Sequence, residues 1–209
     1  MPHLDMRYCY IYFSLLAFFF IFCGGSAIYG QKAYKKEIKD YRKANAAALL
    51  ANEKGPLDKK GVRQLRFYKP NIHFQVWADF TPTPEAKPFD MPTYSGELQS
   101  YITFGKAKFE IDGQIYELNI YRNLRQIRMP MFRNNLFLPF KDQTNDKGTY
   151  GGGRYINIKT SDIVDGKVLI DFNKAYNPYC AYSDGYVCPI PPAENHLPLR
   201  IPAGEKDFK

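Results

Sequence analysis

The sequence has few of the residue types that usually mark catalytic or metal sites. Its 209 residues include three histidines and four cysteines. Of the cysteines, only Cys180 and Cys188 lie beyond the first thirty residues. Seven residues separate these two cysteines, which does not match the spacing of zinc-binding pairs, and His196 is the only imidazole near them. GxSxG, HExxH, GxxxxGK[ST] and GxGxxG do not occur. We therefore expect neither a metal nor a cofactor.

Charge is missing from one long stretch near the start of the chain. No charged side chain occurs between Arg7 and Lys32, and Tyr8–Phe22 is almost wholly apolar. Small residues follow at positions 24–27. A basic start, an apolar run and a small-residue cleavage site are typical of a secretory signal, but an apolar run of this length can also span a bilayer. Residues 1–30 are predicted to be a signal peptide or, if uncleaved, a membrane anchor, with a lipid on Cys23 as a third alternative.

Basic residues follow this segment directly. Residues 31–70 hold twelve Lys/Arg and four Asp/Glu, a difference of +8 that equals the formal net charge of the whole chain. Positive charge just after an apolar segment opposes export. The two late cysteines indicate the opposite, because a disulfide persists in oxidising compartments. We expect an exported protein, periplasmic or anchored in the cell envelope, with Cys180 and Cys188 joined. Nucleic acid is not an expected partner, since no recognition motif accompanies the basic segment.

Periodicity predicts helix first and strands later. Tyr34, Ile38 and Tyr41 recur at helical spacing, so residues 31–54 should be helical, with a short second helix near 58–64. We expect residues 31–64 to form a basic helical segment packed on the following domain. From residue 65 the period becomes two, and strands are expected at 73–80, 101–104, 107–111, 114–121, 136–140, 154–159, 167–172 and 199–201.

Turn residues join several of these strands. Asp112 and Gly113 predict a tight hairpin between residues 107 and 121, and Asp165 and Gly166 mark another turn. Many short strands separated by turns are typical of antiparallel folds. The predicted fold class is mainly β, an antiparallel β-barrel or sandwich preceded by one or two N-terminal helices, with the β-domain over residues 65–209.

Four segments of the second half carry a family resemblance: Thr149–Tyr155 (TYGGGRY), Asp171–Cys180 (DFNKAYNPYC), Cys188–Asn195 (CPIPPAEN) and Ala203–Glu205 (AGE). With them the chain, from about Tyr34 to its end, resembles the DUF1684 family, a bacterial domain of unknown function often found behind export signals. The resemblance implies export and a single domain. It implies no biochemical role.

The glycines before Arg154 are a candidate ligand site. Backbone N–H groups of Gly151, Gly152 and Gly153 can form an anion-holding concavity, and Arg154 can bind a carboxylate or phosphate. The alternative is that these glycines permit a bulge where a strand begins. We expect this turn to lie against the proline-rich loop, residues 171–195. The loop residues suited to hydrogen-bonding a polar ligand, or to locking the loop, are Asn173, Tyr176, Asn177 and Asn195.

Carboxylates and one histidine are the candidates for catalysis. Asp142, Asp171, Glu194 and Glu205 lie at strand ends or in loops, and His196 follows Glu194 closely. Three hypotheses remain open. The first is an exported protein that binds a small polar or anionic ligand. The second is a hydrolase that uses Asp142, Asp171, Glu194 or His196, and the third is a structural or interaction protein of the envelope. The sequence indicates no oligomeric state.

Overall fold

The computed structural model describes residues 30–51 and 53–208. The chain divides into two units, one ending at Asp40 and the other running from Tyr41 to Lys209. The predicted signal peptide or anchor lies almost wholly outside the described residues. Within the described ranges, no helix combines the length and the apolar character needed to cross a bilayer.

Two helical segments precede the sheet, as the sequence predicts. Residues 30–51 are helical, and α2 (Lys59–Val62) follows. Asp58 caps α2, because its Oδ1 accepts a hydrogen bond from the backbone N–H of Gly61 at 2.7 Å. Single-turn 3-10 helices lie in the connections: η1 (Ile72–Phe74), η2 (Gln126–Arg128), η3 (Pro130–Phe132), η4 (Thr160–Asp162), η5 (Phe172–Lys174), η6 (Tyr179–Ala181) and η7 (Ala193–Asn195).

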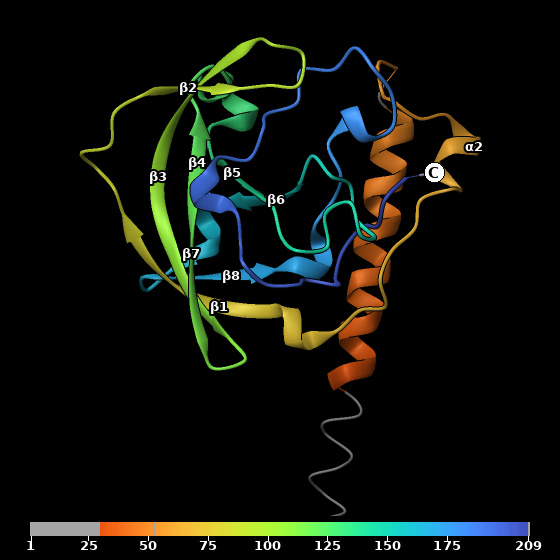
Figure 1. Cartoon of the computed structure of the whole chain (residues 1–209), viewed down its shortest axis with the longest axis horizontal. Coiled ribbons are helices and arrows are strands. Elements are labelled where there is room, and N and C mark those ends of the chain that lie inside the picture. Colours follow the sequence, from red (N-terminus) through yellow and green to blue (C-terminus); the bar gives the residue numbers. More distant parts are fainter. Residues whose placement is uncertain (1–29, 52, 209) are drawn as a thin grey trace, which may run out of the picture. The chain divides into compact units, whose positions relative to one another are not determined.

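Eight antiparallel strands form one sheet, which does not close into a barrel (Figure 1). They are β1 (Gln75–Pro82), β2 (Phe89–Pro92), β3 (Leu98–Ile111), β4 (Gln114–Asn123), β5 (Asn135–Phe140), β6 (Arg154–Lys159), β7 (Ile163–Val164) and β8 (Lys167–Asp171). Their order is β6-β5-β4-β3-β1-β8-β7, and β2 pairs with the first four residues of β3, Leu98–Tyr101. The predicted mainly β, antiparallel class is confirmed.

Both predicted turns are tight hairpins. Asp112 and Gly113 have φ values of 54° and 75°, and Asp165 and Gly166 have φ values of 50° and 70°. Two successive residues with positive φ match the turn whose twist suits a two-residue hairpin. These turns fix the register of β3 on β4 and of β7 on β8.

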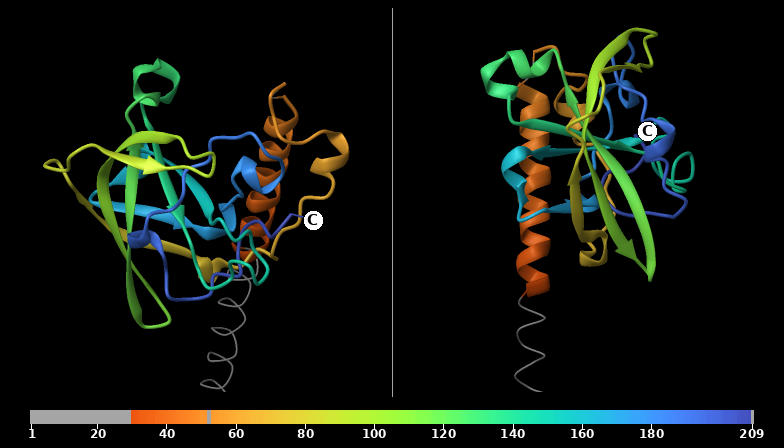
Figure 2. Two further views of the ribbon diagram at one scale, coloured as in Figure 1. Left: turned by 45° about the horizontal axis from the view of Figure 1, so that its top comes forward. Right: turned by 90° about the vertical axis from the view of Figure 1, so that its left-hand side faces the viewer.

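The long strand β3 replaces two predicted strands, 101–104 and 107–111. The two parts are joined through a register shift between Thr103 and Gly105. A Cβ on Gly105 would lie 2.3 Å from Cζ of Phe80 and 2.8 Å from the carbonyl oxygen of Thr81, so only glycine fits there. Such a bulge bends the strand instead of ending it, and Figure 2 shows β3 and β4 as a long curved pair.

The larger core cluster lies on one face of the sheet and includes the C-terminal tail, and Met91, Tyr101 and Tyr121 form a second, smaller cluster. Alternate residues of the strands, such as Leu118, Leu138 and Ile156, pack in the larger cluster with Ile201 and Ala203 of the tail. The predicted strand at 199–201 is wrong. The N–H of Ile201 donates to Oδ2 of Asp142 and its carbonyl accepts from Arg154, so these backbone groups have no need of a strand partner.

Candidate functional site

Arg154 is wholly buried and bonded inside the protein. Its guanidinium donates to Oδ1 of Asp142 at 2.9 Å, to the carbonyl of Ile201 at 3.1 Å and to the carbonyl of Ala203. This cation stabilises the path of the tail, as a buried charge requires satisfied partners. The placement does not fit the predicted role of Arg154 in holding an anionic ligand, because no part of the side chain reaches solvent.

The glycines before Arg154 are required by packing. A Cβ on Gly151 would meet Oδ1 of Asp146 at 2.0 Å, and one on Gly152 would meet the Tyr150 ring at 2.2 Å. Gly153 has a φ of 92°, and a Cβ there would lie 2.7 Å from Cγ of Pro191. The turn therefore contacts the proline-rich loop, as expected. This packing fits the structural alternative.

Asn195 joins the proline-rich loop to the sheet. Its Nδ2 donates to the carbonyls of Asn119 at 2.9 Å and Pro139 at 2.6 Å, and its Oδ1 accepts the N–H of Asn119 at 2.9 Å. Asn173 does the same for the segment before β1: its Nδ2 donates to the carbonyl of Asn71 and its Oδ1 accepts the N–H of Asn71. Asn173 and Asn195, two of the three amides predicted for ligand binding, therefore serve to lock the loop.

Replacing Asn195 by alanine is expected to cost about 2 kcal/mol of stability, because three buried backbone groups lose their partner. Denaturant unfolding measures the change. Glu194→Ala is the matched control, since Glu194 is exposed and neighbours Asn195, and its effect should stay within about 0.5 kcal/mol. Equal stabilities of the two variants would contradict the anchoring role of Asn195.

The four residues predicted for the hydrolase do not come together. Asp142 is held by Arg154 and Thr144, and Asp171 accepts from Asn173 and Gln75. Glu194 and His196 are exposed, and Nε2 of His196 lies 3.0 Å from the carbonyl of Pro191. Two carboxylates are thus used in structural networks. The other two residues are at the surface, outside the cavity described next.

A cavity of about 460 Å³ opens on the sheet face opposite the core. Its floor is formed by side chains of β3, β4, β5 and β6, and its walls by helical residues 41–49 and by the segment 173–189. Seven tyrosines and eight amide residues line it: Tyr41, Tyr101, Tyr155, Tyr176, Tyr179, Tyr182, Tyr186, Asn45, Gln99, Asn123, Gln126, Asn135, Asn157, Asn173 and Asn177. Of the residues predicted for ligand binding, Asn173, Tyr176 and Asn177 therefore lie here.

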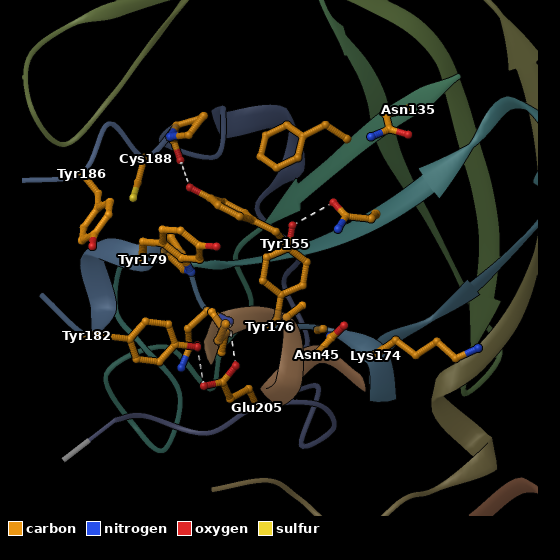
Figure 3. A pocket seen from close by; sticks show the side chains of 18 of the residues that line it. Asn45, Asn135, Tyr155, Lys174, Tyr176, Tyr179, Tyr182, Tyr186, Cys188 and Glu205 are labelled. Carbon is orange, nitrogen blue, oxygen red and sulfur yellow. Dashed lines mark hydrogen bonds between the residues drawn. The ribbon is translucent and has the colours of Figure 1, made fainter. Parts of the chain in front are cut away.

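Figure 3 shows the cavity from close by, with Asn135 on the sheet at one end and Glu205 at the other. Tyr155 donates to the carbonyl of Pro189, and Tyr176 donates to Oδ1 of Asn157 at 2.8 Å. Burial raises the pKa of the Tyr155 and Tyr176 hydroxyls. Both therefore remain protonated at neutral pH and fix the orientation of the rings.

Glu205 is the carboxyl group of the cavity. Its Oε1 accepts the Tyr182 hydroxyl at 2.6 Å and its Oε2 accepts the N–H of Asn177 at 3.1 Å. Burial raises the pKa of Glu205 to about 7, although the hydrogen bonds from Tyr182 and Asn177 and the charge of Arg154 oppose the shift. The group is therefore close to half protonated at neutral pH.

Cys180 and Cys188 close the wall that carries the tyrosines. Their sulfurs are paired as a disulfide and their Cα atoms lie 6.3 Å apart, within the usual range. Tyr179 and Tyr186, which flank the pair, make an edge-to-face contact with ring centroids 5.2 Å apart. Cys188 itself lines the cavity. The short loop between the cysteines thus positions two rings of the cavity.

Sequence reasoning missed the floor of the cavity. Along β6, Ile156 and Ile158 face the core, so Tyr155 and Asn157 must face the other way. The same alternation places Asn135 on the cavity side of β5. The pattern that could have predicted this floor is the residue type on the side of β5 and β6 away from the core. Amides and tyrosines lie there instead of the charged residues expected of a solvated sheet.

Comparisons with known proteins agree with the fold and name no activity. The family described as "Protein of unknown function (DUF1684)" matches residues 60–206. An uncharacterized protein of Haloarcula marismortui, solved by solution NMR, is similar with a TM-score of 0.65 and 27% identity, covering 84% of this chain and 95% of its own. No curated protein matches this chain. On the family match, which spans all eight strands and the tail as far as Lys206, the chain belongs to the DUF1684 family.

Proposed function

We propose that the protein binds a small polar molecule in the cavity above β3–β6 and does not transform it. The observation that carries the proposal is the cavity itself. Its volume of about 460 Å³ falls within the range of roughly 300–1,000 Å³ typical of small-molecule sites, and aromatic rings and amides converge on it. Asn177 adds to this, because its buried Oδ1 has no hydrogen-bond partner among the described residues.

The residues of the cavity favour binding over hydrolysis. Its lining holds one carboxylic acid, Glu205, and includes no histidine, serine or threonine of the described chain. Cys188 is paired with Cys180. Hydrolysis by acid and base groups usually requires two suitably placed partners. The residues predicted for a hydrolase, Asp142, Asp171, Glu194 and His196, lie outside the lining.

We also propose that this binding takes place outside the cytosol. The apolar run of residues 8–22 and the cysteine pair support export. In protein isolated from the cell envelope without reductant, mass spectrometry should show the peptide pair of Cys180 and Cys188 two hydrogens lighter than the reduced form. The double substitution C180S/C188S should cost about 2–3 kcal/mol, the loop entropy of a bridge this short. Free thiols at both positions in that material would contradict export.

Filling the cavity should abolish binding. Ala46 lines the cavity from helical residues 41–49, so Ala46→Trp places an indole in the space a ligand needs. Ala47→Trp is the matched control, because Ala47 is exposed on the same helix and is not part of the lining. A metabolite library screened by thermal shift should give hits with the wild type and A47W that A46W loses, with at least a tenfold rise in Kd.

The hits are then incubated with the wild type and analysed by mass spectrometry. A hit recovered unchanged supports binding without turnover, and a converted hit would support the hydrolase alternative. Equal thermal shifts of the wild type and A46W with every compound would mean that the cavity is not a binding site. That outcome would support the alternative of a structural or interaction protein.

A further inference from the structure

We infer that the ligand is a neutral ring compound rich in hydroxyl groups, of the kind a pyranose sugar presents. This inference rests on the proposed function and names the class of molecule that the same cavity takes. Three properties of the lining carry it: the state of its charged groups, the chemistry of its amides and the arrangement of its rings.

The charged side chains of the lining already make contacts within the protein. Arg42 donates to the carbonyls of Tyr68 at 3.0 Å and Asn173 at 3.4 Å, and its guanidinium lies 4.6 Å from the centre of the Phe67 ring. Lys174 lies over the Tyr41 ring, 4.0 Å from Oδ2 of Asp171. An ionic ligand would have to lose its hydration and compete with these contacts, which is unfavourable.

The carboxyl group of Glu205 offers no anionic anchor either. Both of its oxygens accept hydrogen bonds, from Tyr182 and Asn177, and only 3% of the residue is exposed. An amine ligand would therefore have to displace one of these partners. The charged side chains of the lining are thus already engaged with the protein before a molecule enters the cavity.

Amides supply the polar contacts. The Asn135 side chain lies on the floor of the cavity, and no hydrogen bond joins it to another described residue. The buried Oδ1 of Asn177 is an unused acceptor in the wall. Each amide side chain offers donors and an acceptor together, and a hydroxyl group is likewise both donor and acceptor. Several hydroxyls on one ring can therefore be satisfied by amides at different places around the cavity.

The rings of the lining suit a sugar better than a flat base. Tyr155 and Tyr176 meet at 87°, and Tyr179 and Tyr186 at 84°. The most nearly parallel pair, Tyr101 and Phe137, is in direct contact with centroids 5.7 Å apart, so no base fits between them. Ring faces turned in different directions match the C–H faces of a puckered sugar, because aromatic faces attract positively polarised edges.

The test compares matched probes. Wild type, A46W and A47W are titrated calorimetrically with four neutral sugars, glucose, N-acetylglucosamine, maltose and cellobiose. The same proteins are titrated with glucuronic acid and glucosamine as charged analogues, and with adenosine and uridine as flat ones. We expect at least one neutral sugar to bind the wild type and A47W, and to bind A46W at least tenfold more weakly. Its charged analogues and the nucleosides should bind the wild type at least tenfold more weakly than that sugar.

A second pair of variants tests the amide contact without filling the cavity. Asn135→Leu should weaken the sugar at least tenfold, since an unpaired hydroxyl then faces an apolar side chain. Asn134→Leu is its control, because Asn134 is exposed and outside the lining, and it should leave the Kd unchanged.

The outcomes separate the inference from the function it rests on. Binding that A46W abolishes but that favours glucuronic acid, glucosamine or a nucleoside would overturn the neutral-sugar inference and leave the binding cavity intact. A neutral sugar that binds N135L with the same Kd as the wild type would overturn the inference as well. Absence of any A46W-sensitive binding, in this panel and in the metabolite library, would overturn both.

Discussion

Replacing Arg154 by methionine is expected to destabilise the domain by about 3–5 kcal/mol, the cost of breaking a buried ion pair from one side. Methionine replaces the aliphatic part of the arginine side chain and ends before the guanidinium. The substitution leaves the Asp142 carboxylate buried without its cation and the carbonyls of Ile201 and Ala203 without their donor. Because those carbonyls belong to the tail, the change should also loosen residues 201–205, which carry Glu205.

Arg200→Met is the matched control for this experiment. Arg200 is exposed and makes one long contact, 3.4 Å, to the carbonyl of Gln143, so its loss should change stability by no more than about 0.5 kcal/mol. Denaturant unfolding of both variants measures the difference. The double variant R154M/D142N, which removes the orphaned charge, should recover part of the loss. Equal stability of R154M and R200M would contradict the structural role given to Arg154.

Raising the pH from 4 to 8 should lower the free energy of unfolding of the wild type by about 3 kcal/mol more than that of Glu205→Gln. The pKa of Glu205 is raised from 4.5 to about 7 in the folded protein, chiefly by burial. Each pKa unit corresponds to about 1.4 kcal/mol. Glutamine stays neutral, and its amide can keep the contacts with Asn177 and Tyr182.

The direction follows from proton binding. Between pH 4.5 and 7 the unfolded chain has released the Glu205 proton while the folded protein still holds it, so stability falls as the pH rises through this window. Above pH 7 the contribution of Glu205 to the free energy of unfolding no longer changes with pH. Unfolding curves at several pH values measure it, with Glu85→Gln as an exposed control that should follow the wild type. Parallel pH profiles for the wild type and E205Q would contradict an elevated pKa at Glu205.

Most of the sheet is predictable from local patterns. The turns at Asp112–Gly113 and Asp165–Gly166 require positive φ, which these residue types tolerate, and alternation then sets the facing of the strands. The errors have long-range causes. The bend at Gly105 depends on Phe80, a residue 25 positions away, and residues 199–201 are held by side chains of Asp142 and Arg154 instead of by a strand.

The candidate site was less predictable than the fold. Arg154, Asn173 and Asn195 have side chains suited to a ligand, but the structure uses each of them on the protein's own backbone. Local sequence does not distinguish these uses, because the backbone groups that they bind lie 47 or more residues away in the chain. Tyr176 and Asn177, which the composition of the proline-rich loop indicates as candidates, line the cavity. Asn135 was missed because it looks like an ordinary strand-edge residue.

The location of a bound ligand tests the central claim most directly. Amide chemical shifts of the 15N-labelled protein can be recorded while the tightest-binding hit is added. We expect the shifts to change at residues of the cavity, above all Asn135, Asn157, Asn177 and Tyr182, and to remain constant in A46W. Changes gathered instead around exposed Trp77 on β1 or the β3–β4 hairpin would show that the cavity is not the binding site.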